Sequence, residues 1–232
     1  MRVRRTLTAI ISVSALTLVI APPAVSAGAT PTGVASAVRW YEGKTGTVQW
    51  AIGSEFLAQL DQAGAVLSFC SAAKIAVDES SGVTIVTMPA HGSSAIRLNA
   101  RDSSMDGSAD CAATITGNNT SVELTTLGFD VASAYPSGIS ASVNDERAVL
   151  GSGARMKLPK QAVRNKITVV SPVLLVDSTF ADLLRGPQDA SGAYTGPVPT
   201  MTTEPTTLGL FQLSLKVKVT KVGPMSSGNS EG

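Results

Sequence analysis

The C-terminal part of the chain contains an alternating stretch that restricts the fold more than any other segment. From position 212 to 220, polar and branched apolar residues occupy alternate positions; the apolar set is Leu213, Leu215, Val217 and Val219, and the polar set is Gln212, Ser214, Lys216, Lys218 and Thr220. A two-residue period places alternate side chains on opposite faces of a β-strand. The stretch 208–222 therefore predicts a strand with one face on a core and the other in water. Its register is well specified, because a shift of one residue would bury the lysines.

The composition of the remaining chain also favours strands over helices. Val, Thr, Ser and Gly are frequent, 15% of the residues are charged, and the formal net charge is +1. β-branched residues suit the pleated surface of a sheet, whereas a near-neutral chain lacks the basic patch that nucleic acids or anionic lipids require. We therefore expect a mainly β, antiparallel β-sandwich-like fold with one or two short helices, and no nucleic-acid partner.

The N-terminus has the pattern of a cleaved secretory signal peptide. Arg2, Arg4 and Arg5 form a basic region, an apolar run covers 7–20, and small residues at 25–27 fit a cleavage site. This run is too short and wrongly flanked for a permanent membrane anchor. No later apolar run reaches the length that a bilayer requires. We expect a secreted or cell-surface protein with no transmembrane segment in the mature chain.

The sequence divides into four parts by composition. Residues 1–27 are the predicted signal peptide, and residues 28–38, rich in Gly, Ala, Thr, Pro and Ser, are a predicted flexible leader. Residues 39–222 form a predicted β-rich domain, which is either undivided or split into two subdomains near 145–165. Residues 223–232 are a predicted disordered tail.

Turn signals separate a series of short elements within the β-rich part. A strand at 47–52 leads into a short helix that Ser54 is expected to cap and Gly64 to end. A second short helix at 180–185 follows Ser178 or Thr179 as its expected cap. Further strands are predicted at 65–70, 74–77, 83–88, 94–100, 112–116, 122–132 and 138–143, and at 166–176 as an edge strand, a bulge or two strands, because Pro172 cannot donate to a ladder.

The two strand-to-helix junctions share a weak sequence echo. Ile52-Gly-Ser54-Glu-Phe56 followed by Leu60 resembles Val176-Asp-Ser178-Thr-Phe180 followed by Leu184. Two related halves of the chain would produce this pattern. Residues that are common at any strand-to-helix junction would also produce it, and we favour a chance similarity.

Cys70 and Cys111 are the two cysteines of the chain. An even count in an exported protein is most simply a disulfide, and closing this loop would stabilise the fold by roughly 4 kcal/mol in the chain-entropy model. The alternative is two free thiols, because Cys70 ends an apolar run where an inert buried thiol could also sit. We predict the disulfide.

Short matches to serine acyl-transfer motifs occur in the chain. Ser71 to Lys74 fits S-x-x-K, Ser142 to Asn144 fits S-x-N, and Lys44 begins K-T-G; in penicillin-binding proteins and β-lactamases these motifs supply the nucleophile, a polar partner and the substrate clamp. The order along the chain is permuted, and such triples arise easily from common residues. A Ser-His-Asp hydrolase has little support either, since His91 is the only histidine, no G-x-S-x-G elbow exists, and His91 is expected in an exposed turn.

A polar loop is predicted from Arg101 to Asp110, and it carries oxygen donors at calcium-loop spacing. The candidate ligands are Asp102, Ser104, Asp106 and Asp110, with glycine at the sixth position. Position twelve is Ala113, where a calcium loop needs a bidentate Glu. An acidic, solvated hairpin loop is the alternative interpretation.

The segment 46–98 contains Trp50-Ala-Ile-Gly-Ser-Glu-Phe56, a predicted strand leading into a short helix, and His91-Gly92 before a predicted strand. These motifs resemble the opening of the HtaA family of secreted haem-binding domains. The resemblance implies a β-rich fold and haem as a cofactor, with His91 as a haem-site residue. The tyrosine that ligates iron in that family would fall at Gln59, and an amide is a poor substitute for tyrosinate. The ligand tyrosine is therefore absent here.

These observations lead to a ranked expectation. We expect a secreted or cell-surface, non-catalytic binding or structural module that recognises an unknown extracellular ligand or surface component, with no cofactor. The leading alternative is a haem-binding or transport domain of HtaA type, and serine acyl transfer comes last.

The first testable prediction concerns export. Secretion of the full chain should give a mature protein beginning at Gly28, or at Thr30 after the alternative cut, because the small residues that precede these positions suit signal peptidase. Intact-mass measurement of the secreted protein checks the cleavage position. A secreted protein that retains Met1 would contradict the signal-peptide interpretation.

Overall fold

The computed structural model describes residues 38–93, 96–98, 103–132, 138–143, 146–152, 158–159, 161–203 and 206–223. The predicted signal peptide, and all but one residue each of the predicted leader and tail, lie outside these residues. The first strand begins at Val38, which is buried, so the β-rich part starts one residue before its predicted boundary.

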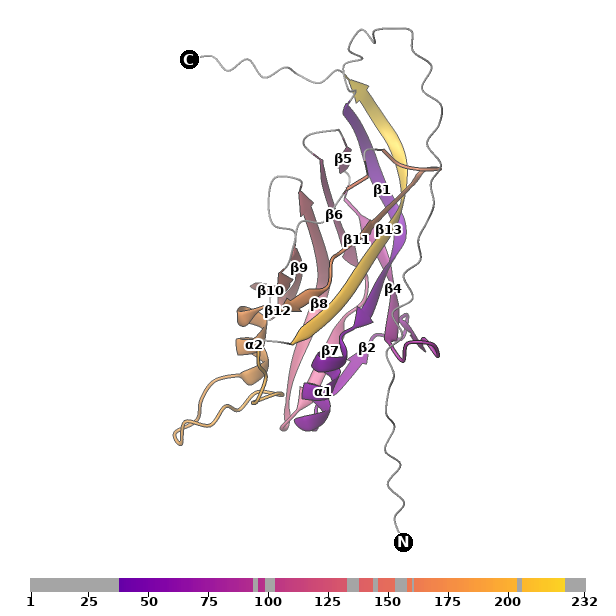
Figure 1. Cartoon of the computed structure of the whole chain (residues 1–232). Helices are drawn as coiled ribbons and strands as arrows, with labels where there is room; N and C mark the ends of the chain where they lie inside the picture. The colour runs from indigo at the N-terminus through magenta and orange to yellow at the C-terminus, as the bar shows by residue number, and fades with distance from the viewer. Residues whose placement is uncertain are drawn as a thin grey trace, which may run out of the picture. The chain divides into compact units, whose positions relative to one another are not determined.

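Thirteen strands and two short helices make up the described part of the chain (Figure 1). The helices are α1 (Ser54–Gln62) and α2 (Ser178–Arg185). Every pairing between described strands is antiparallel, which confirms the expected mainly β, sandwich-like fold. The strands are β1 (Val38–Ile52), β2 (Val66–Phe69), β3 (Lys74–Val77), β4 (Thr84–Gly92), β5 (Ile96–Leu98), β6 (Ser104–Ala109), β7 (Ala113–Gly117), β8 (Thr120–Ala132), β9 (Gly138–Val143), β10 (Glu146–Ser152), β11 (Lys166–Val170), β12 (Leu174–Val176) and β13 (Thr207–Gly223).

Eight strands form a closed ring of pairings. The order around the ring is β1, β4, β6, β8, β9, β10, β12 and β13, and β13 pairs back to β1. Because each of these strands has a partner on both sides, the ring leaves few open backbone edges. The remaining strands attach to this ring, and β2 and β3 are the two ends of the strand order.

The C-terminal strand β13 pairs with three other strands, β1, β11 and β12 (Figure 1). Leu213, Leu215 and Val217 are buried, as their alternation predicts. Val219 was expected on the same buried face but is 43% exposed, because the pairing with β11 ends at Lys216. The predicted core face of β13 is therefore correct for three of its four apolar residues.

Ser214 departs from the predicted wet face of β13. It is buried, and its backbone pairs with Thr47 of β1 on one side and Thr168 of β11 on the other. The Ser214 and Thr168 hydroxyls share a hydrogen bond of 3.1 Å. Alternation alone cannot predict this burial, because it says nothing about what covers the second face of a strand.

The apolar segment around Pro172 resolves one of the open alternatives. It forms two strands, β11 and β12, and Pro172 lies between them. Pro89, in contrast, lies inside β4, at a point where the pairing with β3 has ended at Thr87 and the pairing with β6 begins at Ala90. Both prolines occupy positions where no ladder needs their missing N–H.

The helices are confirmed, and so is the glycine predicted to end α1, but the predicted N-terminal caps are wrong. Gly53 precedes α1 and supplies no side-chain cap, so Ser54 is the first helical residue. For α2, the Asp177 carboxylate accepts a hydrogen bond from the Thr179 N–H, which makes Asp177 the cap in place of Ser178 or Thr179. Asp caps as well as Ser does.

Two further predictions were wrong in the middle of the chain, and one strand was missed. The predicted polar loop at 101–110 contains strand β6, and His91 belongs to strand β4 and not to a turn. Strand β10 was not predicted at all. In β6 and at the end of β4, several inward positions hold small residues, Ala90, Gly92, Gly107 and Ala109, so these segments lack the strong alternation of large apolar residues that signals a strand.

The disulfide between Cys70 and Cys111 is confirmed, with Cα atoms 5.5 Å apart. It joins the segments that follow β2 and precede β7, two strands that also pair directly. A covalent link at this point restricts the unfolded chain and fixes the segment that follows β6.

The predicted subdomain boundary near 145–165 stays a prediction. Part of this stretch lies outside the described residues. Close to it, the Ala162 N–H donates a hydrogen bond of 3.2 Å to the hydroxyl of Tyr41, a buried residue of β1.

Side chains on β13 provide the second testable prediction. Leu213→Ala should lower the free energy of unfolding by about 2–5 kcal/mol, because it removes buried methyl groups and leaves a cavity. Val219→Ala should cost less than about 1 kcal/mol, since that side chain is half exposed. Urea unfolding with fitted m-values measures both.

Lys218→Thr is the matched control on the exposed side of β13, and it should change stability by no more than about 0.5 kcal/mol. Equal losses for Leu213→Ala and Val219→Ala would show that the register described here is wrong.

Candidate functional site

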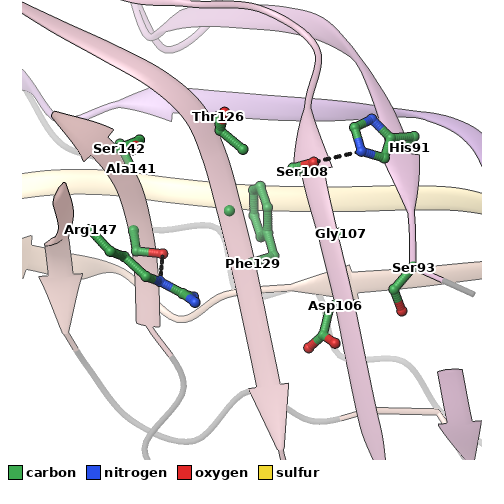
Figure 2. A pocket seen from close by; sticks show the side chains of 12 residues that line it. His91, Ser93, Asp106, Gly107, Ser108, Thr126, Phe129, Ala141, Ser142 and Arg147 are labelled. Carbon is green, nitrogen blue, oxygen red and sulfur yellow. Dashed lines mark hydrogen bonds between the residues drawn. The ribbon is translucent and has the colours of Figure 1, made fainter. Parts of the chain in front are cut away.

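A hollow of about 460 Å³ lies across β4, β6, β8, β9 and β10. Its lining combines hydroxyl groups, one guanidinium, one carboxylate (Asp106), one imidazole and one aromatic residue (Figure 2). We refer to this feature as the hollow; its lining residues are His91, Ser93, Asp106, Gly107, Ser108, Thr126, Gly128, Phe129, Ser140, Ala141, Ser142 and Arg147.

Strand register explains which side chains face the hollow. Ala90 and Ala109 pair across β4 and β6, and both are buried. Because side chains alternate, the next residues, His91 and Ser108, point to the opposite, outer face, and they too are a directly paired couple. The core side of this sheet is thus packed while its outer side carries polar groups.

A row of paired residues continues from His91 across the outer face. Ser108 of β6 pairs with Gly128 of β8, and Gly128 pairs with Ser140 of β9. We call His91, Ser108, Gly128 and Ser140 the outer-face row. A side chain at position 128 would project between its neighbours, so the glycine leaves the space that forms the floor of the hollow. A Cβ placed there would meet its nearest atom, the Ser140 Oγ, at 3.4 Å, so the backbone itself tolerates a larger residue.

A bulge in β8 lies beside this row. The pairing of β8 with β9 shifts between Thr125 and Gly128, and Thr126 within the shift has φ of +50°. A β-branched residue in this region of φ is strained, and Thr126 is exposed, so no packing offsets the cost. Bulges of this kind turn side chains toward new directions and occur often next to functional sites.

Arg147 supplies a permanent positive charge to the hollow. It pairs across β9 with Ser142, and its Nε donates a hydrogen bond of 2.8 Å to the Ser140 hydroxyl. Figure 2 shows Arg147 and His91 at opposite sides of the hollow, with Phe129 between them. The bond to Ser140 holds the guanidinium over the end of the outer-face row.

His91 bonds through both of its ring nitrogens. The Asp110 carboxylate contacts Nδ1, and the Ser108 Oγ lies 3.0 Å from Nε2. An ionised carboxylate only accepts hydrogen bonds, so Nδ1 donates to Asp110, which leaves Nε2 as the nitrogen that faces the serine hydroxyl. The Asp110 backbone is fixed as well, because its N–H donates to the Pro89 carbonyl at 2.9 Å.

The calcium-loop geometry is not present at the predicted segment. Asp102 lies outside the described residues, while Ser104 and Asp106 belong to strand β6. A strand holds its residues extended and cannot wrap their oxygens around one ion as a calcium loop does. Asp106 lines the hollow, whereas Asp110 bonds His91. Among the described residues, no three His, Cys, Asp or Glu side chains are grouped to hold a metal ion.

The structure brings together only part of the set that carries the HtaA resemblance. Trp50 and Phe56 are both fully buried, with ring centroids 6.1 Å apart. His91 is exposed and pairs with Thr45, whereas Trp50 pairs with Val86 further along the same two strands. His91 therefore does not join the aromatic pair, and the haem expectation stays a prediction.

Gln59, at the position where that family has its tyrosine, holds a loop in place. Its amide oxygen accepts a hydrogen bond of 2.8 Å from the Thr202 N–H, and its amide nitrogen donates to the Thr202 and Thr206 hydroxyls. The side chain thus uses both ends of its amide to attach the segment before β13 to α1.

The acyl-transfer motif residues are also dispersed. Lys74 belongs to β3, whose one partner among the described strands is β4, and Lys44 bonds Glu42 on β1. Ser142 belongs to β9 and lines the hollow, and Asn144 lies outside the described residues. The three motifs do not build the serine site that their family uses.

Sequence reasoning missed the groups that do come together. Neither Ser108 nor Arg147 is a predicted site residue, because the sequence predicts a loop where β6 lies and no strand where β10 lies. The signal present in the sequence was a set of small, outward-facing residues and the only histidine of the chain. These residues indicate a site only when the pairing between β4 and β6 is known, because that pairing brings them together.

Comparison with known proteins does not assign this chain to a family. No family model, no curated protein and no solved structure matches it. Neither described helix has the length and apolar character needed to cross a bilayer. Function is therefore argued from the geometry of the hollow.

Strain at the bulge gives the third testable prediction. Thr126→Gly should raise the free energy of unfolding by about 1 kcal/mol, because glycine adopts positive φ without the steric cost that threonine bears. Thr125→Gly is the matched control and should lower stability, since Thr125 donates a hydrogen bond of 3.2 Å to the Ser142 carbonyl. Thermal or urea unfolding measures both. A loss of stability in Thr126→Gly would show that the bulge is not strained.

Proposed function

We propose that the protein is a secreted or cell-surface binding module whose ligand site is the hollow. The ligand is a small hydroxylated acid, such as an acidic sugar. The predicted signal peptide and the Cys70–Cys111 disulfide support an extracellular place of action, because disulfides persist in oxidising compartments.

The outer-face row is the observation that carries this proposal. Ser108 and Ser140 flank a glycine that leaves open space, and further hydroxyls from Ser93, Thr126 and Ser142 surround it. Each hydroxyl both donates and accepts a hydrogen bond, so together they match the repeated hydroxyl groups of a polyol or sugar. An apolar ligand would cover these hydroxyl groups without offering them any hydrogen bonds in place of those to water, and it is disfavoured for that reason.

Arg147 points to an acidic ligand in preference to a neutral one. Its guanidinium lies at one end of the row and is the one Lys or Arg side chain among the described residues that line the hollow. Guanidinium groups bind carboxylates through short, charge-assisted hydrogen bonds, which are about twice as strong as neutral ones. The Phe129 ring is almost fully buried and packs against Phe211 on the core side of the sheet, so it contributes little surface to the ligand.

The fourth testable prediction uses glucuronate as the probe and glucose as its neutral match. Titration followed by amide chemical shifts should show saturable changes for glucuronate, confined to β4, β6, β8, β9 and β10. Arg147→Gln should raise the Kd for glucuronate at least tenfold, because a hydrogen bond to a charged group is worth about 1.5–3 kcal/mol.

A second variant tests the space itself. Gly128→Val should abolish binding while leaving the fold intact, because its methyl groups would extend into the hollow from a position with room for a Cβ. Lys218→Gln, on the exposed part of β13, is the control and should not change the Kd. Unchanged binding in both Arg147→Gln and Gly128→Val would exclude the hollow as the site.

A further inference from the structure

His91, Ser108 and Asp110 have the connectivity of a serine hydrolase triad. The Asp110 carboxylate contacts Nδ1 of His91, and Nε2 of the same ring lies 3.0 Å from the Ser108 Oγ. The distance between Oγ and Nε2 is within the range in which a general base takes a proton. In such triads, the carboxylate fixes the tautomer of the imidazole and stabilises the imidazolium that forms, and the imidazole activates the serine.

The fold positions all three residues. His91 and Ser108 are opposite each other in the β4–β6 ladder, and Asp110 follows Ser108 by two residues, on the same outer face. The Asp110 N–H is bonded to the Pro89 carbonyl, and the next residue, Cys111, is held by the disulfide. The strand register, a backbone hydrogen bond and the disulfide thus together hold His91, Ser108 and Asp110 in place.

The serine also faces a space in which a substrate can sit. His91 and Ser108 both line the hollow, and Figure 2 shows the Ser108–His91 hydrogen bond at its edge. Asp110 does not line the hollow and contacts the far nitrogen of the ring, as the orienting group of a triad does. A bound ester would also displace water from the exposed His91 ring, which strengthens the electrostatic interactions within the trio.

We propose that Ser108 is a catalytic nucleophile that transfers the acyl group of small esters to water, with His91 as general base and Asp110 as positioning residue. This inference uses the same hollow as the proposed binding function, but it does not depend on the ligand named there. It departs from the expectation that the chain is not an enzyme.

The reaction has two balanced steps. The Ser108 Oγ bonds to the ester carbonyl carbon while its proton moves to His91 Nε2, and the ester C–O bond then breaks as the leaving oxygen takes that proton and departs as the alcohol. Water next attacks the acyl-serine with His91 again accepting a proton. The acid is released, and Ser108 regains its hydrogen. No oxidant, metal ion or cofactor is consumed.

The experiment that tests this proposal is covalent labelling with diisopropyl fluorophosphate, which reacts with activated serines. The native secreted protein should gain one diisopropylphosphoryl group, located at Ser108 by peptide mass mapping, and should hydrolyse p-nitrophenyl acetate. Ser108→Ala should abolish both reactions. His91→Gln should slow labelling at least 100-fold, because it removes the general base, and Asp110→Asn should slow it at least tenfold.

Two controls keep the outcome decisive. Ser121, on the exposed side of β8 and without a histidine partner, should remain unlabelled, and Ser121→Ala should react as the native protein does. Near-UV circular dichroism establishes that each variant is folded. Absence of a Ser108 adduct, or a labelling rate unchanged in folded His91→Gln, would overturn the proposal and leave the trio as a structural link between β4 and β6.

The two proposals can fail separately. A protein that is labelled at Ser108 but does not bind glucuronate supports the triad and contradicts the binding proposal. A protein that binds glucuronate through Arg147 but resists labelling gives the opposite result.

Discussion

The contact between Trp50 and Phe211 is the interaction on which the rest of the structure depends. The two rings stack with centroids 5.1 Å apart, and the Trp50 indole N–H donates a hydrogen bond of 3.1 Å to the Leu208 carbonyl. A buried indole needs such a partner, because an unsatisfied N–H in the core is costly. The bond requires close approach at Gly209, where an added Cβ would lie 2.1 Å from the Ala51 carbonyl oxygen. One aromatic pair thereby fixes the register between the first and last strands.

Both strand-to-helix junctions assemble around this point. β1 and β12 each pair with β13 at Gly209, and each strand then runs into a short helix. The helices meet through Phe56 and Phe180, whose ring centroids are 6.2 Å apart. The sequence echo between the two junctions covers the residues that lead each strand into its helix, and it includes the two aromatic residues that meet, Phe56 and Phe180. Each helix places one aromatic residue against the same core, which is a packing requirement that needs no common origin.

A strand could be predicted from the sequence where large apolar residues recur on its inward face. β13 and α1 were recognised because large apolar residues recur on one face, as Leu213 and Leu215 do. β6 was missed since Gly107, an inward residue, has no side chain, although a Cβ there would lie 2.9 Å from the Leu213 side chain. A tightly packed core therefore demanded a glycine at the position where a sequence pattern needs an apolar residue. The burial of Ser214 and the position of His91 were unpredictable for a related reason, because both depend on long-range pairing.

The need for inward glycines next to the leucines of β13 also explains why the candidate site lies on this part of the sheet. Inward glycines at positions 92 and 107 let β4 and β6 approach the leucines of β13, which leaves the outer residues of these strands free of any role in the core. The side chains of His91 and Ser108 do not pack in the core, and Gly128 has no side chain. Residues that do not pack in the core are free to take part in a site. Their spacing is still set by the core, because core packing fixes the strand register. The regular spacing of the polar residues on the exposed face therefore follows from packing on the opposite face. Substitutions in this row can change the chemistry of the site without changing the fold.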